Sequence, residues 1–148
     1  MIPTQRIVDR MIPEDRKQLP KQIRLTSSER QAKNEAENER KMHNQFSDYL
    51  RLRKQVFQFV HANPTKRSTI KRGWPDYTVI CKIMARLRPR PVACLIEFKV
   101  PGGKLSPDQI QCFNELEIAG IPVYVVTSLT DAIELLIEYF ELPREILS

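Results

Sequence analysis

Two carboxylates and a lysine are spaced so that they could form one reactive centre. Asp76 precedes a short apolar segment, and Glu97 and Lys99 interrupt a second apolar run, residues 92–100. Because side chains alternate along a strand, Glu97 and Lys99 would share one face of it. A carboxylate and an ammonium in an otherwise apolar strand are costly unless they are paired or bind a metal. The oxygens of Asp76 and Glu97 suit a hard cation such as Mg²⁺, which also takes phosphate oxygens, so the pattern predicts a metal-dependent phosphodiesterase centre.

The turn before Asp76 predicts how this carboxylate is presented. Gly73 allows a backbone conformation that other residues avoid, and Pro75 fixes the φ angle just ahead of Asp76. Together they would hold Asp76 rigidly at the start of a strand over residues 77–84. Trp74, inside the same turn, has two interpretations: it stacks on a base, or it packs beneath the turn.

A helix with a well-marked start follows the second apolar strand. Ser106 is an N-cap candidate, Pro107 stands at the first helical position, and Gln109 completes a capping box. Gln109 therefore has a structural explanation of its own. The helix would end before Gly120, and residues 121–127 predict a buried strand. A connection through a helix favours a parallel, right-handed crossover between the two strands.

The remaining segments complete an α/β fold. Residues 55–62 alternate as a half-buried strand does. A helix is expected to start at Ser27 or Ser28, with cap candidates in the segment Ser27-Ser28-Glu29-Arg30. A last amphipathic helix would be capped by Ser128 or Thr130. The apolar stripe of the first helix consists of Met42, Phe46, Tyr49 and Leu50. The expected order is α-β-β-β-α-β-α, with a mixed central sheet flanked by helices.

The first 26 residues differ in character from the rest of the chain. They contain prolines at positions 3, 13 and 20, mixed charge and little periodicity, which predicts a flexible N-terminal arm over residues 1–26. Such an arm would follow the DNA backbone, wrap a second subunit, or be an ordinary solvated tail. Residues 27–148 would then form a single domain.

Composition narrows the class of protein. The 148 residues carry a formal net charge of +6 and a pI near 9.4, which favours polyanionic partners. The odd set Cys81, Cys94 and Cys112 fits no closed disulfide framework and predicts free thiols in a reducing cytoplasm. With only His43 and His61 available, a histidine-rich zinc site or an HNH-type site is excluded, and His61 is expected at a strand end. No apolar run has the length of a membrane span, and the start lacks the apolar core of a signal peptide.

These motifs together resemble a known nuclease family. Pro-Asp followed by Glu-x-Lys is the PD-(D/E)XK signature, which is weak alone because short charged patterns arise by chance. The flanking residues make the chain similar to the VRR-NUC domain over roughly residues 39–136. The residues that carry this resemblance are Gly73, Pro75, Asp76, Glu97, Phe98, Lys99, Lys104-Leu105-Ser106-Pro107-Asp108-Gln109 and Gly120-Ile121-Pro122-Val123.

The resemblance implies a restriction-endonuclease-like core that hydrolyses DNA phosphodiesters. Asp76 and Glu97 would hold one or two Mg²⁺ or Mn²⁺ ions. The Phe98 carbonyl and Glu39 would complete the ligand set. The ion would acidify a water that attacks phosphorus and would stabilise the developing charge. Lys99 would orient or activate that water.

Two further positions are assigned through the resemblance. The matching glutamine of the family lies beside the catalytic centre, which places Gln109 there. The family also carries a glutamate in its first helix, and counting back along the helix puts Glu39 at that position. Glu35 and Glu37 are alternatives, and a solvated helix-face charge is an equal explanation of Glu39. His43 stands where many relatives would have glutamine.

Two basic loops flank the predicted centre. One precedes the Gly73 turn, and the other, over residues 85–91, would be a stiff turn between antiparallel strands. Such residues would contact the nucleic-acid backbone, or they are generic surface charge. The basic residues concerned are Lys66, Arg67, Lys71, Arg72, Arg86, Arg88 and Arg90.

The resemblance implies a small endonuclease encoded by a phage or a bacterium, with DNA as its partner. We expect structure-selective cleavage of branched DNA, similar to a Holliday-junction resolvase, by a homodimer that places two sites on two strands. The alternatives are a less selective, flap or single-strand nuclease, a DNA-binding module of the same fold without catalysis, and a scaffold protein whose basic patches are incidental.

Overall fold

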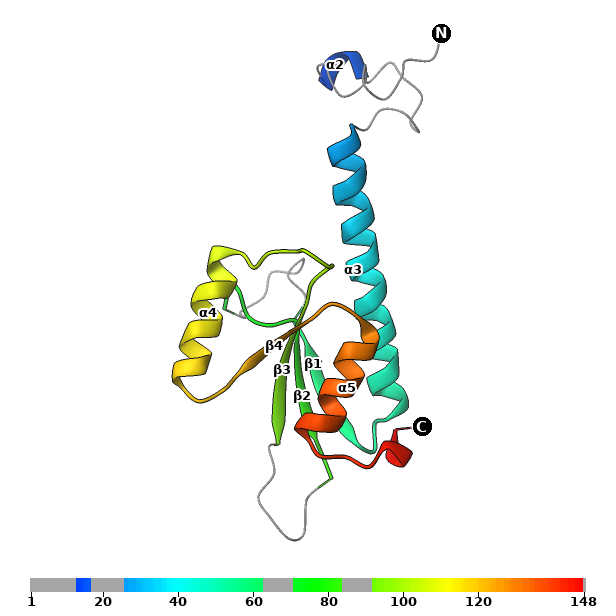
Figure 1. The fold of residues 1–148 in the computed structure, drawn as a ribbon, viewed down its shortest axis with the longest axis vertical. Helices are drawn as coiled ribbons and strands as arrows, with labels where there is room; N and C mark the ends of the chain where they lie inside the picture. Colours follow the sequence, from blue (N-terminus) through cyan, green and yellow to red (C-terminus); the bar gives the residue numbers. More distant parts are fainter. Residues whose placement is uncertain (1–12, 17–25, 63–70, 84–91, 148) are drawn as a thin grey trace. The chain divides into compact units, whose positions relative to one another are not determined.

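The computed structural model describes residues 13–16, 26–62, 71–83 and 92–147 (Figure 1). The chain divides into two compact units, Met1–Arg40 and Lys41–Ser148, which are described separately. The elements are α2 (Pro13–Arg16), α3 (Ser27–Leu52), β1 (Phe57–His61), β2 (Tyr77–Cys81), β3 (Ala93–Phe98), α4 (Pro107–Ile118), β4 (Val123–Val126), α5 (Leu129–Tyr139) and the 3-10 turn η2 (Arg144–Ile146).

The first unit contains α2 and the first part of α3. The start of α3 at Ser27 is as expected, but the capping residue is Thr26 rather than Ser27 or Ser28. The Thr26 hydroxyl accepts from the amide of Glu29 at 3.2 Å, and the Glu29 carboxylate accepts from the amide of Thr26 at 2.8 Å. This reciprocal pair is a capping box. Most of the predicted arm lies outside the described residues, and the boundary at residue 26 stays a prediction.

The second unit is built on a four-stranded mixed sheet in the order β1-β2-β3-β4. β1 pairs antiparallel with β2, and β2 pairs antiparallel with β3. β3 and β4 run parallel and are joined through α4. The expected order α-β-β-β-α-β-α and the mixed sheet with flanking helices are therefore confirmed.

One face of the sheet carries the main hydrophobic core. Residues opposite one another in the register share a face, and Tyr77 lies opposite Ile96. The core also takes side chains from the second half of α3 and from α5, which is capped by Ser128. Fully buried members are Phe46, Leu50, Tyr77, Val79, Ile96, Phe98, Ala132 and Leu136. The three cysteines are free thiols, and Cys94 and Cys112 are buried.

The opposite face of the sheet carries Glu97 and is only partly covered. Leu95 and Glu97 on this face are buried, and Gln109 of α4 donates a hydrogen bond to Glu97. Over β1 and β2 the same face is open, since Val60 is 55% exposed and Ile80 is 39% exposed. Along the described ranges, no helix is both long and apolar enough to cross a membrane.

The strand expected over residues 121–127 is present as β4, but the expectation that it is buried is wrong. β4 pairs with β3 alone among the described strands, so it forms an edge of the sheet. Val125, opposite Glu97 in the register, is 46% exposed. An apolar segment predicts a strand without revealing its place in the sheet, because an edge strand and a central strand can have the same composition.

Candidate active site

The turn before β2 is fixed by its contact with the start of α4. Gly73 has a φ of 76°, a conformation that L side chains rarely adopt. A β-carbon at this position would also overlap the backbone of Asp108. Pro75 is buried and leads directly into Asp76. Gly73 therefore has two reasons to be glycine, its φ angle and the close approach of the Asp108 backbone. The second of these packs the turn that carries Asp76 against the start of α4.

Backbone amides connect the two carboxylates at the ends of neighbouring strands. The Asp76 Oδ2 atom accepts a hydrogen bond of 2.8 Å from the amide of Phe98. In return, Glu97 Oε2 accepts one of 3.2 Å from the amide of Asp76. Each carboxylate is thus tied to the backbone next to the other, which brings Asp76 and Glu97 together as the sequence predicts.

Glu97 is a buried carboxylate with a set of donors around it. Its side chain is 1% exposed, and Lys99 Nζ lies 2.8 Å from Oε1. Gln109 Nε2 donates to the same oxygen. Burial raises the pKa of Glu97 most, and the negative charge of Asp76 raises it further, whereas the ion pair with Lys99 lowers it. The net effect is a pKa above the ordinary value of a glutamate.

Gln109 joins the start of α4 to this carboxylate. The predicted capping box is confirmed, because Ser106 Oγ accepts from the amide of Gln109 at 3.2 Å and Gln109 Oε1 accepts from the amide of Ser106 at 2.9 Å. The amide oxygen of Gln109 thus caps the helix while its nitrogen donates to Glu97. The structural and the site-related readings of Gln109 are compatible.

A histidine that sequence reasoning left outside the candidate site lies beside Asp76. His43 Nε2 is 3.5 Å from Asp76 Oδ2, and His43 Nδ1 is 2.9 Å from Nε2 of His61. The His61 ring stacks on Tyr77 at a centroid distance of 4.3 Å. A signal was available, since His43 precedes the apolar Phe46 by three positions and shares its helix face.

Tyr77 holds the helix segment that carries His43. Its hydroxyl donates to the backbone carbonyl of His43 at 2.8 Å and pairs with Ser47 Oγ at 2.7 Å. Burial is the main reason that the pKa of Tyr77 is raised to about 12, so the hydroxyl keeps its proton at neutral pH. The pKa of His61 is lowered, first by burial and then by His43 and Arg51.

The predicted basic residues are placed only in part. Lys71 and Arg72 are described and exposed, and Lys71 forms an ion pair with Glu115 of α4. The other basic candidates fall in residues 63–70 and 84–91, outside the described residues; they are Lys66, Arg67, Arg86, Arg88 and Arg90.

The helical glutamates belong to the first unit. Glu39 is partly buried, whereas Glu35 and Glu37 are exposed, and Glu35 accepts a hydrogen bond of 2.9 Å from Gln31 one turn earlier. The assignment of Glu39 as a metal ligand stays a prediction.

The donor set around Asp76 fits a hard divalent cation. The described residues contain no group of three or more His, Cys, Asp and Glu side chains that could hold a metal ion. The paired carboxylates Asp76 and Glu97 are enough for Mg²⁺, which usually binds one or two carboxylates and fills its other positions with water and substrate phosphate. Burial and then the charge of Asp76 raise the pKa of Glu97, and a cation between the two carboxylates would favour the ionised form of both.

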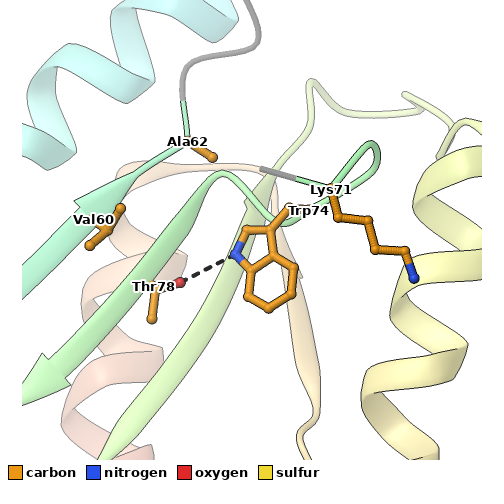
Figure 2. Close-up of a pocket in the computed structure, with 5 residues that line it drawn as sticks. All are labelled: Val60, Ala62, Lys71, Trp74 and Thr78. Atoms are coloured by element: carbon orange, nitrogen blue, oxygen red, sulfur yellow. Dashed lines mark hydrogen bonds between the residues drawn. The ribbon is translucent and has the colours of Figure 1, made fainter. Parts of the chain in front are cut away.

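An apolar pocket of about 350 Å³ opens beside the same turn (Figure 2). It is lined by Val60, Ala62, Lys71, Trp74 and Thr78. The Trp74 indole nitrogen points at the Thr78 hydroxyl at 3.5 Å. The Lys71 side chain extends toward α4 and not across the indole ring.

Comparison with known proteins gives two kinds of similarity. A sequence model of the VRR-NUC domain matches residues 7–129, a range that includes Asp76, Glu97, Lys99 and Gln109. A solved structure named VRR_NUC domain is 22% identical, covers 67% of this chain and 98% of its own, and has a TM-score of 0.47. Another solved structure, named VRR_NUC domain protein, is 21% identical, covers 74% of this chain and 89% of its own, and has a TM-score of 0.46. No curated protein matches the chain.

Proposed function

The chain belongs to the VRR-NUC domain family of nucleases, and from this premise we propose that it hydrolyses DNA phosphodiester bonds with Mg²⁺ or Mn²⁺. The observation that supports this most is the buried Glu97, joined to the backbone at Asp76 and to the side chains of Lys99 and Gln109. A buried carboxylate with a raised pKa beside a second carboxylate is typical of a reactive or metal-binding site. An ordinary structural ion pair would not need the second carboxylate.

In this proposal Asp76 and Glu97 hold the ion, with the Phe98 carbonyl and Glu39 as further candidates. A divalent ion bound there would supply a Lewis acid beside the scissile phosphate and lower the pKa of water. Gln109 and the Asp76 amide hold the Glu97 carboxylate in one orientation, so it does not have to reorganise when substrate arrives.

Lys99 is proposed to stabilise the transition-state charge and to orient or activate the attacking water. Its ammonium lies 2.8 Å from Glu97 and is 16% exposed, so it is close to the carboxylates and still partly open to a substrate. A cation in this position would offset the negative charge that develops on the phosphate and orient the attacking water.

His43 is added to the predicted site as a positioning residue. It lies 3.5 Å from the Asp76 carboxylate and is held in turn by His61 and by the Tyr77 hydroxyl at its carbonyl. The contact restrains the same Asp76 oxygen, Oδ2, that accepts from the Phe98 amide. Substitution of His43 should therefore weaken metal binding more than it changes the fold.

We propose DNA as the substrate, with branched DNA preferred and a homodimer as the active form. The net charge of +6 and the exposed Lys71 and Arg72 near the site support a polyanionic substrate. A two-fold dimer would present two centres to two strands, as symmetric junction cleavage requires. The odd cysteine count supports a reducing cytoplasm. The origin in a bacterium or its phage is proposed from the family alone.

A cleavage panel tests the proposal. Duplex, single-stranded, flap and four-way junction DNA are incubated with the full chain in Mg²⁺, in Mn²⁺ and in chelator. We expect metal-dependent cleavage, fastest on the junction, and a dimer mass in light scattering. Cleavage of no substrate with either ion would contradict the nuclease proposal.

The same panel is run with the variant Glu97→Gln and with Glu115→Gln as its matched control. Both changes neutralise a glutamate that is paired with a lysine. Glu97→Gln should abolish cleavage, and Glu115→Gln should retain it. Cleavage by Glu97→Gln at the wild-type rate would show that the centre lies elsewhere.

A further inference from the structure

The pocket beside Trp74 has no part in the hydrolysis described above. It lies on the open face of the sheet, where Val60 of β1 and Thr78 of β2 are opposite each other in the register. Its volume of about 350 Å³ falls within the usual range of small-ligand sites, about 300–1,000 Å³. The pocket is therefore large enough for one flat heterocycle.

The chemistry of the pocket walls favours a nucleobase. Trp74 contributes an aromatic face, and Val60 and Ala62 contribute apolar walls. Besides Lys71, the polar groups of the described lining residues are the indole N–H of Trp74 and the Thr78 hydroxyl. A base combines a π-face with a hydrogen-bonding edge and stacks on aromatic side chains irrespective of its identity.

The charge at the rim argues against a free phosphate as the occupant. Among the lining residues that the structure describes, Lys71 is the one cationic side chain, and its ammonium is paired with Glu115. A phosphate here would have to compete with that carboxylate and would face mostly apolar atoms, which is costly for an anion.

We propose that this pocket holds one unpaired base of the DNA strand that is cut. Trp74 is separated from Asp76 only by the rigid Pro75, so a base stacked on Trp74 belongs to a nucleotide next to the proposed centre. Bases inside a duplex are stacked and paired and cannot enter such a pocket without being extruded. In flaps and single strands this base is already unpaired, and in the four-way junction proposed above it would have to be extruded at the branch point. This inference rests on the proposed nuclease function for the identity of the strand.

The single tryptophan of the chain makes the pocket directly observable. Because Trp74 is the only tryptophan, intrinsic fluorescence reports on the pocket alone. The full chain is titrated in chelator, where no cleavage is needed, with a short single strand, an abasic strand of equal length, and a blunt duplex. We expect saturable quenching by the single strand and little change with the other two. Equal quenching by the abasic strand would overturn the proposal, because that strand has the phosphates but not the bases.

Four variants separate the pocket from the turn that carries Asp76. Trp74→Ala should weaken single-strand affinity by about tenfold or more, and Trp74→Phe by no more than about threefold. Val60→Phe fills the pocket from β1 without changing the turn, and should also weaken affinity about tenfold. Ile80→Phe adds the same ring to the same face outside the pocket and should change affinity by less than about twofold.

The outcomes distinguish this inference from the proposed function. Quenching without any metal-dependent cleavage would refute the nuclease proposal and leave the base pocket supported. Cleavage with no fluorescence response, and with Trp74→Ala and Val60→Phe binding DNA as the wild type does, would refute the pocket and leave the nuclease supported.

Discussion

Two lysine–glutamate ion pairs near the Gly73 turn have the same chemistry but differ in burial: one is buried and the other is exposed to solvent. Lys99 pairs with Glu97, whose side chain is 1% exposed, and Lys99 itself is 16% exposed. Lys71 pairs with Glu115, and these side chains are 49% and 48% exposed. The first pair lies at the end of β3 among the core strands, and the second joins the loop before β2 to the outer surface of α4.

The difference in burial reverses the effect on the glutamate. The pKa of Glu97 is raised, because burial and the charge of Asp76 outweigh the ion pair. The pKa of Glu115 is lowered, chiefly by its hydrogen bond from Lys71 and then by one from Gln111. An ion pair in solvent is screened and contributes little, whereas a buried one alters the protonation of the whole site. A lysine partner alone therefore does not identify a functional glutamate; burial beside a second carboxylate does.

The largest effect is expected from Asp76→Asn. Loss of a metal-binding carboxylate should reduce cleavage at least about a thousandfold, since several kcal/mol of transition-state stabilisation disappear. The folded chain should not be harmed. The amide oxygen of asparagine can still accept from the Phe98 amide, and the repulsion on Glu97 is removed.

The sign of the stability change in chelator follows from the raised pKa of Glu97. The Glu97 carboxyl group keeps its proton to higher pH in the folded protein than in the unfolded chain. Its contribution to folding stability is therefore complete below the pKa that Glu97 has in the unfolded chain, and it is lost as the pH rises through the pKa that Glu97 has in the folded protein. Asp76→Asn removes the negative charge next to Glu97, so less folding stability is lost when Glu97 ionises. The melting temperature in chelator at pH 8 should therefore rise by about 2–4 °C, corresponding to about 1 kcal/mol. A lower melting temperature at pH 8 would show that repulsion between the carboxylates is not significant.

The next largest effect on cleavage and folding stability is expected from Lys99→Met, and Lys71→Met is its matched control. Lys99→Met leaves Glu97 buried without its cation, which should cost about 3 kcal/mol of folding stability and reduce cleavage by about a hundredfold or more. The loss of folding stability should be greatest at pH 8 and smaller toward pH 5, because a protonated Glu97 is neutral and no longer a buried charge without a partner. Lys71→Met should leave both properties near the wild type. Equal losses in the two variants, measured by denaturant unfolding and cleavage, would mean that burial does not separate the pairs.

The Gly73 turn, between the two pairs, can be tested with a matched glycine. Gly73 and Gly102 have nearly the same φ, 76° and 79°, but only Gly73 abuts the backbone of α4, whereas Gly102 has open space around it. Gly102→Ala should cost about 1–2 kcal/mol from backbone strain alone, and Gly73→Ala about 2–4 kcal/mol because overlap with Asp108 is added. Gly73→Ala should also slow cleavage about tenfold by moving Gln109 away from Glu97. Similar costs for both variants would show that α4 can shift freely.

The sequence predicts local features of the site better than its long-range contacts. The capping box of Ser106 and Gln109 could be predicted because both partners lie within one helical turn. The turn conformation of Gly73 could be predicted from its place in the Gly-Trp-Pro-Asp segment, whereas its close approach to Asp108 of α4 could not. The approach of His43 to Asp76 could not be predicted in the same way, because it depends on how α3 packs on the sheet. The position of β4 at the sheet edge likewise depends on strand order, which apolar composition does not encode.

The smallest effect concerns the exposed pair itself, and it is measured in DNA binding rather than in folding. Because Lys71 and Glu115 are in solvent, neutralising either should shift the melting temperature by no more than about 1 °C. If Lys71 contacts a phosphate as proposed, Lys71→Gln should flatten the slope of log affinity against log salt by about one unit. Glu115→Gln should act in the opposite direction, because it releases the Lys71 ammonium from its competing carboxylate. The double variant should resemble Lys71→Gln, since Glu115 acts on DNA only through Lys71. A slope that is unchanged in all three variants would place the DNA backbone away from this side of α4, while the buried pair at Glu97 would keep its proposed role.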